Sequence, residues 1–405
     1  MTERRSSEPL GAAAPRPGAF AAAAAGEPTA GEPTAGEATG RGSTQPEEAF
    51  GAALANLPGM GPVRLAAILR HRSPAAAWAV VRAGAPGPLA AVWRERSRSY
   101  DVEAGWAVLQ AAGVATYVQG RPGYPPELAA DHEAPGVLFS RGDVARLAGR
   151  RVAVIGARNC TRYGRDVAFE LGRDLAANGV VVVSGLALGV DGAAHEGALA
   201  AACAPPVAVV GSGLDVVYPR RHARLWEQVG AAGALLSEAP LGAVPEPWRF
   251  PARNRIIAAL AEVVVVVESR HQGGSRHTVE AAIGRGRPVM AVPGPVRSAT
   301  SDLPNALLAE GCHPARDALD VLVALGLSPS TAVAPPSHDR PPPDPADAAV
   351  LEGVGWRPAT FEQIVVATGR TPATVGVALA HLERDGWVAG RGGWWERVAT
   401  TPITR

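Results

Sequence analysis

The stretch Phe250-Pro-Ala-Arg-Asn-Arg-Ile-Ile-Ala-Ala-Leu260, followed by the valine run Val263–Val267, decides the fold of this chain. The apolar end of the stretch predicts a helix that packs on a sheet. The valine run predicts a strand that is buried on both faces. Gly273-Gly274-Ser275 comes next and predicts a turn that opens another helix. This order of helix, buried strand, glycine turn and helix is typical of an α/β domain with a parallel sheet.

Apolar runs on both sides of the stretch continue the same alternation. They predict a Rossmann-like, doubly wound, mostly parallel sheet within a domain that spans 119–325. The expected strands are Val152–Ile155, Val180–Val183, Val207–Val210, Ala234–Leu236, Val263–Val267 and Val289–Val292. The expected helices lie near 165–177, 192–202, 221–230, 253–261 and 277–285. Residues 119–150 contain Pro-Pro and Pro-Gly steps and predict a non-helical connector.

The region before this domain divides into two parts by composition. Residues 1–46 are a low-complexity run of Ala, Gly, Pro and Glu, for which we expect a disordered tail. Residues 47–118 show helical apolar spacing and predict a helical, SAM-like domain. Within it, Leu57-Pro-Gly-Met-Gly-Pro-Val63 predicts the turn of a helix-hairpin-helix motif. That turn either contacts a DNA phosphate or simply joins two helices.

The region after the domain begins with a Pro-rich linker over 326–347. Residues 348–398 then predict a winged-helix-like unit. Its second helix has Thr371 as N-cap and Pro372 at the first position, and a short hairpin turns at Gly392-Gly393. The expected recognition helix carries little positive charge, so DNA binding and protein interaction both remain open for this unit.

Composition limits the compartment and the chemistry. All 39 basic residues are arginine, and the formal net charge is +1. Arginine presents a planar, permanently charged fork that suits phosphate. The 3 cysteines form no CxxC pair, so we expect neither a zinc ribbon nor disulfides, and a reducing cytoplasm is the expected location. Apolar runs are too short for a transmembrane helix, so no membrane association is expected.

Glycine, serine and arginine gather in the loops that follow the expected strands. Ligands of open α/β sheets bind at the carboxyl ends of the strands, so we expect these loops to form one phosphate-binding rim. The candidate residues are Arg158, Ser184, Gly185, Gly211, Ser212, Gly213, Arg220, Arg221, Arg253, Asn254, Arg255, Gly273, Gly274, Ser275 and Arg276. Neither GxGxxG nor GxxxxGK[ST] occurs at a strand end, so no dinucleotide cofactor and no P-loop are expected.

Several candidates have an ordinary structural alternative. Arg253 and Arg255 are expected in the first turn of a helix, where a cation needs either a bound anion or a carboxylate such as Glu238 or Glu268. Arg158 is either a phosphate contact or a surface cap. Asn254 is either a helix cap or a base contact. Trp248 either stacks on a base or packs in the core.

A hydrolytic centre is a further possibility that the sequence raises and does not favour. Ser184, Asp191 and His195 supply the residue types of a hydrolase triad, with Asp191 and His195 four residues apart. No GxSxG elbow holds Ser184, and Asp191 suits the start of a helix. The remaining histidines show no metal-ligand spacing. We therefore expect no catalytic residue, no metal and no cofactor.

Eight ordered motifs resemble one known family. VAVIGARN, SGLALGVDGAAHEGAL, VAVVGSGLDVVYPRRHARL, LLSEAP, FPARNRIIAAL, VVVVVES, GGSRHT and GRPVMAVPGP resemble the DNA-processing protein A (DprA/Smf) family over about 120–320. The resemblance implies a single-stranded DNA-binding protein, not an enzyme. Such proteins protect incoming strands in natural transformation, load the RecA recombinase and dimerise through the Rossmann-like domain.

The resemblance also assigns roles to particular residues. The family's DNA-binding arginine after the first strand falls on Arg158, and the basic residue after Tyr218-Pro219 falls on Arg220, with Arg221 beside it. The FPxRNR motif falls on Arg253, Asn254 and Arg255. Many members carry a lysine or arginine where this chain has Leu188. Arg276 is a candidate to replace that charge.

Two other functions stay open beside DNA binding. Gly273, Gly274, Thr278 and Glu280 echo the Gly-Gly-x-x-Thr-x-x-Glu turn of nucleotide-cleaving phosphoribohydrolases, with altered spacing. Release of a free base from AMP would favour that enzyme. The other is a scaffold for a recombinase in which DNA contact is secondary. A surface variant that loses RecA loading and keeps DNA binding would separate the scaffold role from the DNA-binding role.

Overall fold

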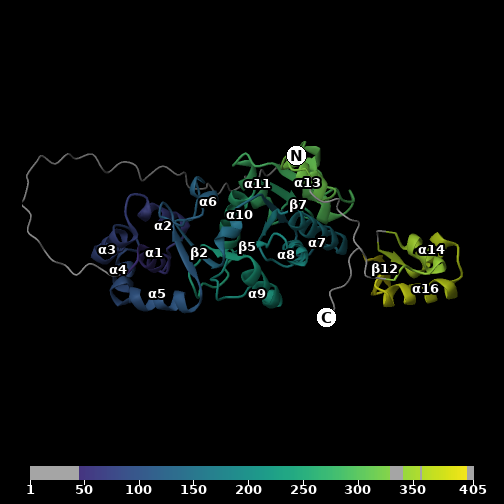
Figure 1. The fold of residues 1–405 in the computed structure, drawn as a ribbon, viewed down its shortest axis with the longest axis horizontal. Coiled ribbons are helices and arrows are strands. Elements are labelled where there is room, and N and C mark those ends of the chain that lie inside the picture. Colours follow the sequence, from purple (N-terminus) through teal and green to yellow (C-terminus); the bar gives the residue numbers. More distant parts are fainter. Residues whose placement is uncertain (1–44, 329–340, 356–357, 399–405) are drawn as a thin grey trace, which may run out of the picture. The chain divides into compact units, whose positions relative to one another are not determined.

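The computed structural model describes residues 45–328, 341–355 and 358–398, and Figure 1 shows their fold. The expected tail over 1–46 lies outside the described residues except for its last two. The middle of the expected linker, 329–340, also lies outside them.

The centre of the fold is a nine-stranded sheet with the order β1-β2-β6-β5-β4-β3-β7-β8-β9. The strands from β6 to β9 along this order pair in parallel, while β2 pairs antiparallel with both β1 and β6. The bounds are β1 (Ala115–Val118), β2 (Val137–Gly142), β3 (Arg151–Ile155), β4 (Val181–Ser184), β5 (Val207–Val210), β6 (Ala234–Ser237), β7 (Val263–Val266), β8 (Val289–Ala291) and β9 (His313–Pro314).

Helices cover both faces of this sheet, as Figure 1 shows. One layer holds α7 (Arg162–Ala177), α8 (Val190–Ala201) and α9 (Ala223–Ala232). The opposite layer holds α10 (Arg249–Leu260) and α11 (Ser275–Ile283). The buried valines of β3, β4 and β7 pack between these layers, as expected for a parallel sheet that is covered on both sides.

The helices α7 and α8 approach each other more closely than side chains allow. A Cβ added to Gly172 of α7 would lie 2.1 Å from the carbonyl oxygen of Ala194, and one added to Gly197 of α8 would lie 2.0 Å from that of Phe169. Only glycine fits at both crossing points, so any larger residue there would push the two helices apart.

The expected doubly wound α/β class is confirmed, with four local corrections. The end of the expected helical region is strand β1, and the expected connector over 119–150 contains strand β2. That connector was expected to be non-helical but also contains the short helix α6 (Pro126–Ala129), because a proline is tolerated at the first position of a helix. Strand β2 pairs with β6, and β1 pairs with β2, so both strands extend the sheet. The helix expected from 253 begins at Arg249, because Pro251 is tolerated within a first helical turn.

The helical region before the sheet has five helices among the described residues. They are α1 (Glu47–Ala55), α2 (Pro62–Leu69), α3 (Pro74–Gly84), α4 (Ala90–Ser99) and α5 (Val102–Ala111). The expected hairpin turn joins α1 to α2, and Trp93 Nε1 donates to its Pro58 carbonyl at 2.8 Å. Apolar residues of these helices share one core with β1, β2 and Trp226 of α9. Short helices complete the α/β part, namely α6 (Pro126–Ala129), α12 (Asp302–Ala309) and α13 (Ala318–Ala324).

The last described part is a winged helix. It contains α14 (Pro345–Val354), β10 (Ala359–Thr360), α15 (Phe361–Thr368), α16 (Pro372–Arg384), β11 (Val388–Arg391) and β12 (Trp394–Arg397). The hydroxyl of Thr371 caps α16 by accepting from the amide of Thr374, as predicted. Helix α14 begins inside the segment expected to be linker. The domain boundaries themselves stay predictions.

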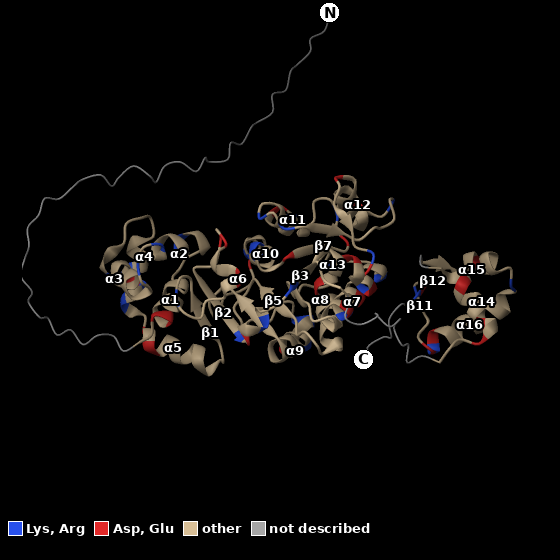
Figure 2. Cartoon of the chain, turned by 45° about the horizontal axis from the view of Figure 1, so that its top comes forward, with Lys and Arg blue, Asp and Glu red and all other residues tan. Residues whose placement is uncertain are grey.

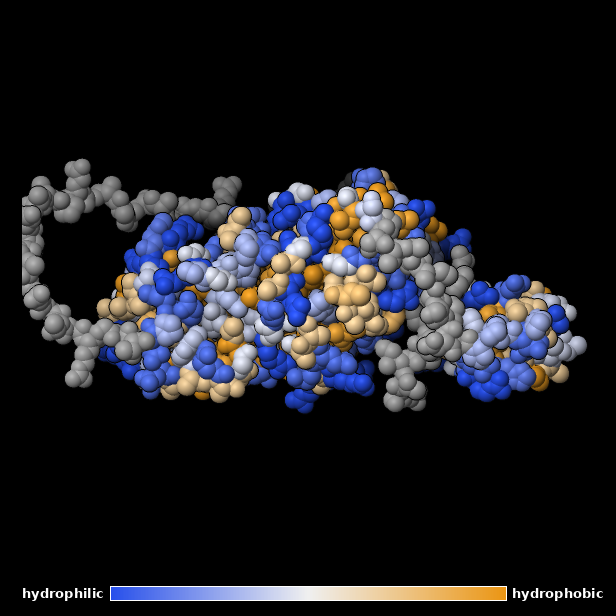
Figure 3. Space-filling model, viewed as in Figure 1, coloured by the Kyte–Doolittle hydropathy of each residue, from blue (hydrophilic) through white to orange (hydrophobic). Residues whose placement is uncertain are grey.

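Polar and apolar residues alternate over the face shown in Figure 3 and form no continuous apolar band. Within the described ranges, no helix combines the length and apolar character that crossing a bilayer requires. Figure 2 shows basic and acidic residues distributed over all parts of the described chain. Charge alone therefore marks no binding face, and the geometry of individual arginines has to do so.

Candidate nucleic-acid interface

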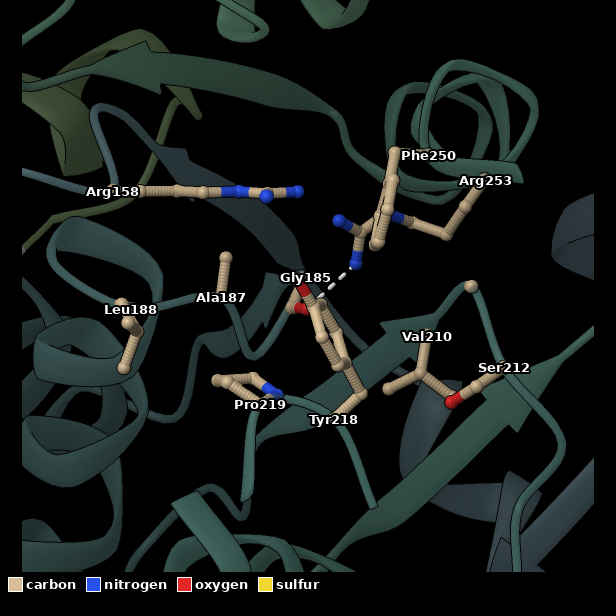
Figure 4. Close-up of a pocket in the computed structure, with 11 residues that line it drawn as sticks. Arg158, Gly185, Ala187, Leu188, Val210, Ser212, Tyr218, Pro219, Phe250 and Arg253 are labelled. Carbon is tan, nitrogen blue, oxygen red and sulfur yellow. Dashed lines mark hydrogen bonds between the residues drawn. The ribbon is translucent and has the colours of Figure 1, made fainter. Parts of the chain in front are cut away.

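The strand-end loops meet where the strand order of the sheet reverses. β3 lies between β4 and β7, so the chain winds outward from β3 in both directions. Such a reversal leaves a crevice outside the carboxyl ends of the strands. Two of the hollows at this edge of the sheet border the loop after β3. One is the pocket in Figure 4, between the loops after β3, β4 and β5, and the other is a cavity of about 470 Å³ beside β3 and β7.

Arg158 is an exposed cation held over an aromatic ring. Its guanidinium carbon lies 4.6 Å from the centroid of the Phe250 ring, and Figure 4 shows the side chain reaching across the pocket toward that ring. The Tyr218 ring lies 5.7 Å from Phe250, centroid to centroid. Arg158 has no ion pair with any described residue. Its charge is thus positioned by a ring and left available for an anion.

Arg253 has a different environment from the one expected. The side chain is only 7% exposed, and one guanidinium nitrogen donates to the carbonyls of Gly185, at 2.6 Å, and Val209. Burial lowers the pKa of Arg253 to about 10, although the nearby negative charge of Asp191 acts to raise it. The guanidinium therefore joins the loop after β4 to strand β5. Arg253 still lines the pocket in Figure 4, and its contact with phosphate stays a prediction.

Gly185 makes the position of Arg253 possible. A Cβ at residue 185 would lie 2.3 Å from the nearest nitrogen of the Arg253 guanidinium. The glycine expected to let a ligand approach instead lets a buried arginine approach. Because residue 185 has no side chain, the Arg253 guanidinium can reach the lining of the pocket.

Arg255 and Asn254 are also held by the protein itself. Arg255 pairs with the buried carboxylate of Glu238, which was the structural alternative foreseen for it, and donates to the Glu133 carbonyl. Asn254 accepts from Arg253 Nε at 3.1 Å and donates to the Gly274 carbonyl at 3.2 Å. Because α10 begins at Arg249, none of these side chains lies in its first turn. The polar groups of Arg255 and Asn254 thus bond to other residues of the protein and stabilise the rim.

The loop after β5 carries the second exposed basic pair. Arg220 and Arg221 lie on the short 3-10 helix η2 (Arg220–His222), directly after the cis Tyr218–Pro219 bond. Both are exposed, and neither forms an ion pair within the part that the structure describes. The loop 211–213, which precedes them in the chain, is buried, and its Ser212 hydroxyl donates to the Val216 carbonyl at 2.8 Å.

Leu188 and Arg276 have different surroundings in this structure. Leu188 is half-buried and lines the pocket in Figure 4. Arg276 lines neither hollow. It pairs with Glu280 at 2.8 Å on the outer side of α11. That Arg276 replaces the missing charge stays a prediction, and in this structure its exposed guanidinium has a carboxylate partner.

The geometry does not form a hydrolase triad. The Ser184 hydroxyl donates to the Val154 carbonyl at 2.7 Å, and no hydrogen bond joins a ring nitrogen of His195 to the side chain of Ser184 or Asp191 within the described chain. Burial lowers the pKa of His195 to about 3 and raises that of Asp191. Over the described ranges, no group of three or more His, Cys, Asp or Glu side chains could hold a metal ion.

Three contributors to the rim were not named as site residues from the sequence. Phe250 and Tyr218 form the aromatic support, and Arg270 lines the cavity beside β7 as an exposed, unpaired cation within the described chain. Phe250 opens the deciding stretch and Tyr218 directly precedes the basic loop. Their closeness in sequence to the arginines was the available signal.

The fold and this rim define a Rossmann-like domain that carries exposed arginines at its strand ends, between a helical region and a winged helix. The family profile described as "DNA recombination-mediator protein A" matches residues 115–326, and the "DprA winged helix domain" profile matches 334–393. The chain belongs to the DNA recombination-mediator protein A (DprA) family.

Individual relatives agree with this assignment. Protein Smf of Escherichia coli K12 is 35% identical over 281 residues, which are 68% of this chain and 75% of Smf. DNA processing protein DprA of Streptococcus pneumoniae is 40% identical over 199 residues, which are 49% of this chain and 70% of that protein. The X-ray structure of DprA from Streptococcus pneumoniae matches with a TM-score of 0.57 and 32% identity, covering 68% of this chain and 96% of that one.

Proposed function

We propose that this protein binds single-stranded DNA without sequence preference along the rim of strand-end loops. Membership of the DprA family supports the proposal, since relatives in Bacillus subtilis and Streptococcus pneumoniae are named DNA processing proteins. The physical support is a row of glycine-rich loops with exposed, permanently charged arginines at their edge. Phosphates along a strand release counterions when they meet such cations, which gives affinity without sequence readout.

The single observation that carries the proposal is the placement of Arg158. It is exposed, free of any carboxylate partner in the described chain, and fixed over the Phe250 ring at the mouth of the pocket. Arg253 and Arg255, which stabilise the fold, each have a carbonyl or carboxylate partner, and Arg158 has neither in the described chain. A cation kept ready for an external anion needs neither.

The residues of the rim have different roles in binding a strand. Arg158, Arg220 and Arg221 contact phosphates, while Arg253 and Arg255 hold the loops in place. Tyr218 is 39% exposed, and its ring offers a flat surface on which a base stacks. Base stacking on aromatic rings is tolerant of sequence because every base has a π face.

We further propose the setting that the family resemblance implies. The protein acts in the cytoplasm as a homodimer, protects incoming strands and delivers them to the RecA recombinase during natural transformation or recombination. Its role is binding rather than catalysis. The phosphoribohydrolase alternative is not favoured, because Glu280 lies outside the cavity that Thr278 lines and pairs with Arg276 instead.

Fluorescence anisotropy with labelled oligothymidylate at two salt concentrations tests strand binding. Arg158→Gln is compared with Arg98→Gln, which removes another exposed arginine, on α4. We expect only Arg158→Gln to weaken binding and to reduce the slope of log K against log salt by about 0.7, the value for one phosphate contact to a single strand. The proposal would be overturned if the two variants bound oligothymidylate with the same affinity and salt slope, or if wild-type protein bound duplex DNA as tightly as single strands.

Delivery to RecA needs its own measurement. RecA filament formation on oligothymidylate is followed with wild-type protein and with Arg158→Gln. The proposal requires that wild-type protein accelerates filament formation and that the variant does so in proportion to its DNA binding. Undiminished acceleration by a variant that no longer binds DNA would instead support the scaffold role.

A further inference from the structure

A groove of about 920 Å³ lies between the helical region and the domain with the parallel sheet. One wall is the hairpin turn between α1 and α2, over 55–65. The other wall is the loop 238–243 after β6, together with the start of α10. The groove adjoins the pocket in Figure 4, because Val210, Gly211 and Arg253 line both hollows. A strand that occupies the pocket therefore has a continuous path into the groove.

Trp248 lines this groove directly before α10 and is held in a fixed position. Its indole Nε1 donates to Glu246 Oε2 at 2.9 Å, and the guanidinium carbon of Arg249 lies 4.5 Å from the ring centroid. Arg249 Nε donates to the same Glu246 oxygen at 3.1 Å. These contacts satisfy the only polar atom of the indole and restrict its rotation. The residue nevertheless remains 48% exposed, so it is not packed in the core.

An aromatic ring that is both fixed and exposed is a surface on which a nucleic-acid base stacks. The groove shares this feature with the neighbouring pocket. Trp248 and Phe250 are two residues apart, and each has an arginine guanidinium over its ring, from Arg249 and Arg158 respectively. The same pairing of a cation with an aromatic ring thus recurs in the pocket and in the groove that continues it.

The charges along the groove suit a polyanion. Its two acidic lining residues are both paired, Glu238 with Arg255 and Glu246 with Arg249. Arg64 of the hairpin wall is exposed and forms no ion pair within the described chain, and one of its nitrogens donates to the Gly59 carbonyl at 2.8 Å. The unpaired charge at the surface of the groove is therefore positive. An aromatic ring beside such a charge is the combination that binds single strands without sequence readout.

We propose that the groove holds the continuation of a bound single strand, with one base stacked on the Trp248 ring and the backbone beside the hairpin wall that carries Arg64. Gly211 lies where the pocket meets the groove, and a Cβ added there would lie 3.4 Å from Phe250 Cδ1, so the glycine keeps the passage open. The inference deepens the proposed function and rests on strand binding by the rim. It extends the strand path to the helical region and gives the hairpin turn a part in DNA binding.

The test uses the full chain and labelled oligothymidylates of increasing length, with fluorescence anisotropy as the readout. Trp248→Leu removes the aromatic face and keeps apolar bulk, whereas Trp248→Phe keeps an aromatic face. The matched control is Trp394→Leu, which removes a tryptophan of similar exposure, 49%, from β12 of the winged helix. The urea unfolding midpoint of each variant checks that it folds.

We expect Trp248→Leu to bind the shortest strands as wild type does, and to lose about fivefold or more in affinity once a strand is long enough to reach the groove. The salt slope should not change, because no charge is removed. Trp248→Phe should keep most of the affinity, and Trp394→Leu should keep all of it. Equal affinity of Trp248→Leu and wild type at every length overturns the inference, as does a loss that is already complete with the shortest strands.

Abasic sites show whether a base is the partner of the ring. In the shortest strand that reveals the Trp248→Leu loss, an abasic site is placed at each position in turn. At one position the missing base should weaken wild-type binding and leave Trp248→Leu binding unchanged, because one contact cannot be lost twice. Additive losses at every position would overturn the stacking. If wild-type protein bound no single strand at all, the proposed function itself would be overturned.

Discussion

The guanidinium carbon of Arg158 lies 4.6 Å from the centroid of the Phe250 ring, although 92 positions separate the two residues in the chain (250 − 158). Phe250 belongs to α10 and Arg158 to the loop after β3, so the contact joins two walls of the pocket in Figure 4. An exposed arginine otherwise samples many rotamers. The ring reduces that freedom and keeps the charge over the strand ends.

Phe250→Leu should therefore weaken strand binding although it removes no charge. A cation–π contact at an exposed site is worth about 0.5–1 kcal/mol, which corresponds to roughly a two- to fivefold loss of affinity. The salt slope should stay that of the wild type because Arg158 remains. Anisotropy titrations compare it with Phe361→Leu in the winged helix. A change of salt slope without loss of affinity would contradict the support role of the ring.

Leu188→Arg should strengthen strand binding, because Leu188 lines the pocket where many family members carry a charge. One added phosphate contact steepens the slope of log K against log salt by about 0.7. Leu319→Arg on α13 changes net charge equally at a residue that is 45% exposed and lines neither hollow. If both variants gained affinity to the same degree, net charge rather than position would be the cause.

Gly185→Ala should destabilise the fold, because its Cβ would overlap the guanidinium of Arg253. Overpacking in a fixed interior costs about 1–3 kcal/mol, and displacing Arg253 would also break its two carbonyl contacts. Urea unfolding is compared with Gly61→Ala, whose added Cβ meets nothing within 4 Å. An unfolding free energy equal to that of Gly61→Ala would show that Arg253 can be moved without cost.

His195 should make the protein sensitive to acid. Burial, with His222 and Arg253 nearby, lowers its pKa from 6.5 to about 3. Between these values the unfolded chain binds a proton that the folded protein does not. The free energy of unfolding therefore falls with falling pH by about 1.4 kcal/mol per pH unit in this window.

The variant His195→Leu removes that titration and should flatten the acid limb of the stability curve. Urea unfolding from pH 7 to pH 4 provides the measurement. The control is His313→Leu, which removes an exposed ring on β9. A slope identical in wild type and His195→Leu would mean that other groups dominate the acid limb.

Valine runs made the parallel sheet predictable, because a strand buried on both faces has a composition that few other elements share. Strands β1 and β2 were missed because their signal is short and lies beside Pro and Gly steps. Arg158 and the pair Arg220 and Arg221 emerged from the sequence as strand-end cations. Arg253 and Arg255 looked equivalent to them there, since a sequence does not show that Gly185 and Glu238 come to meet these side chains from other strands.

The crossing of α7 and α8 at Gly172 and Gly197 has a consequence for ligand capture. Each helix begins directly after a strand-end loop, one carrying Arg158 and the other Leu188. Because the two helices are in backbone contact, neither loop can shift without the other. The spacing between the phosphate sites on these loops is therefore fixed before a strand binds. Little of the interaction free energy is then lost to rearrangement, and a strand held in one region of the rim is in register with the next.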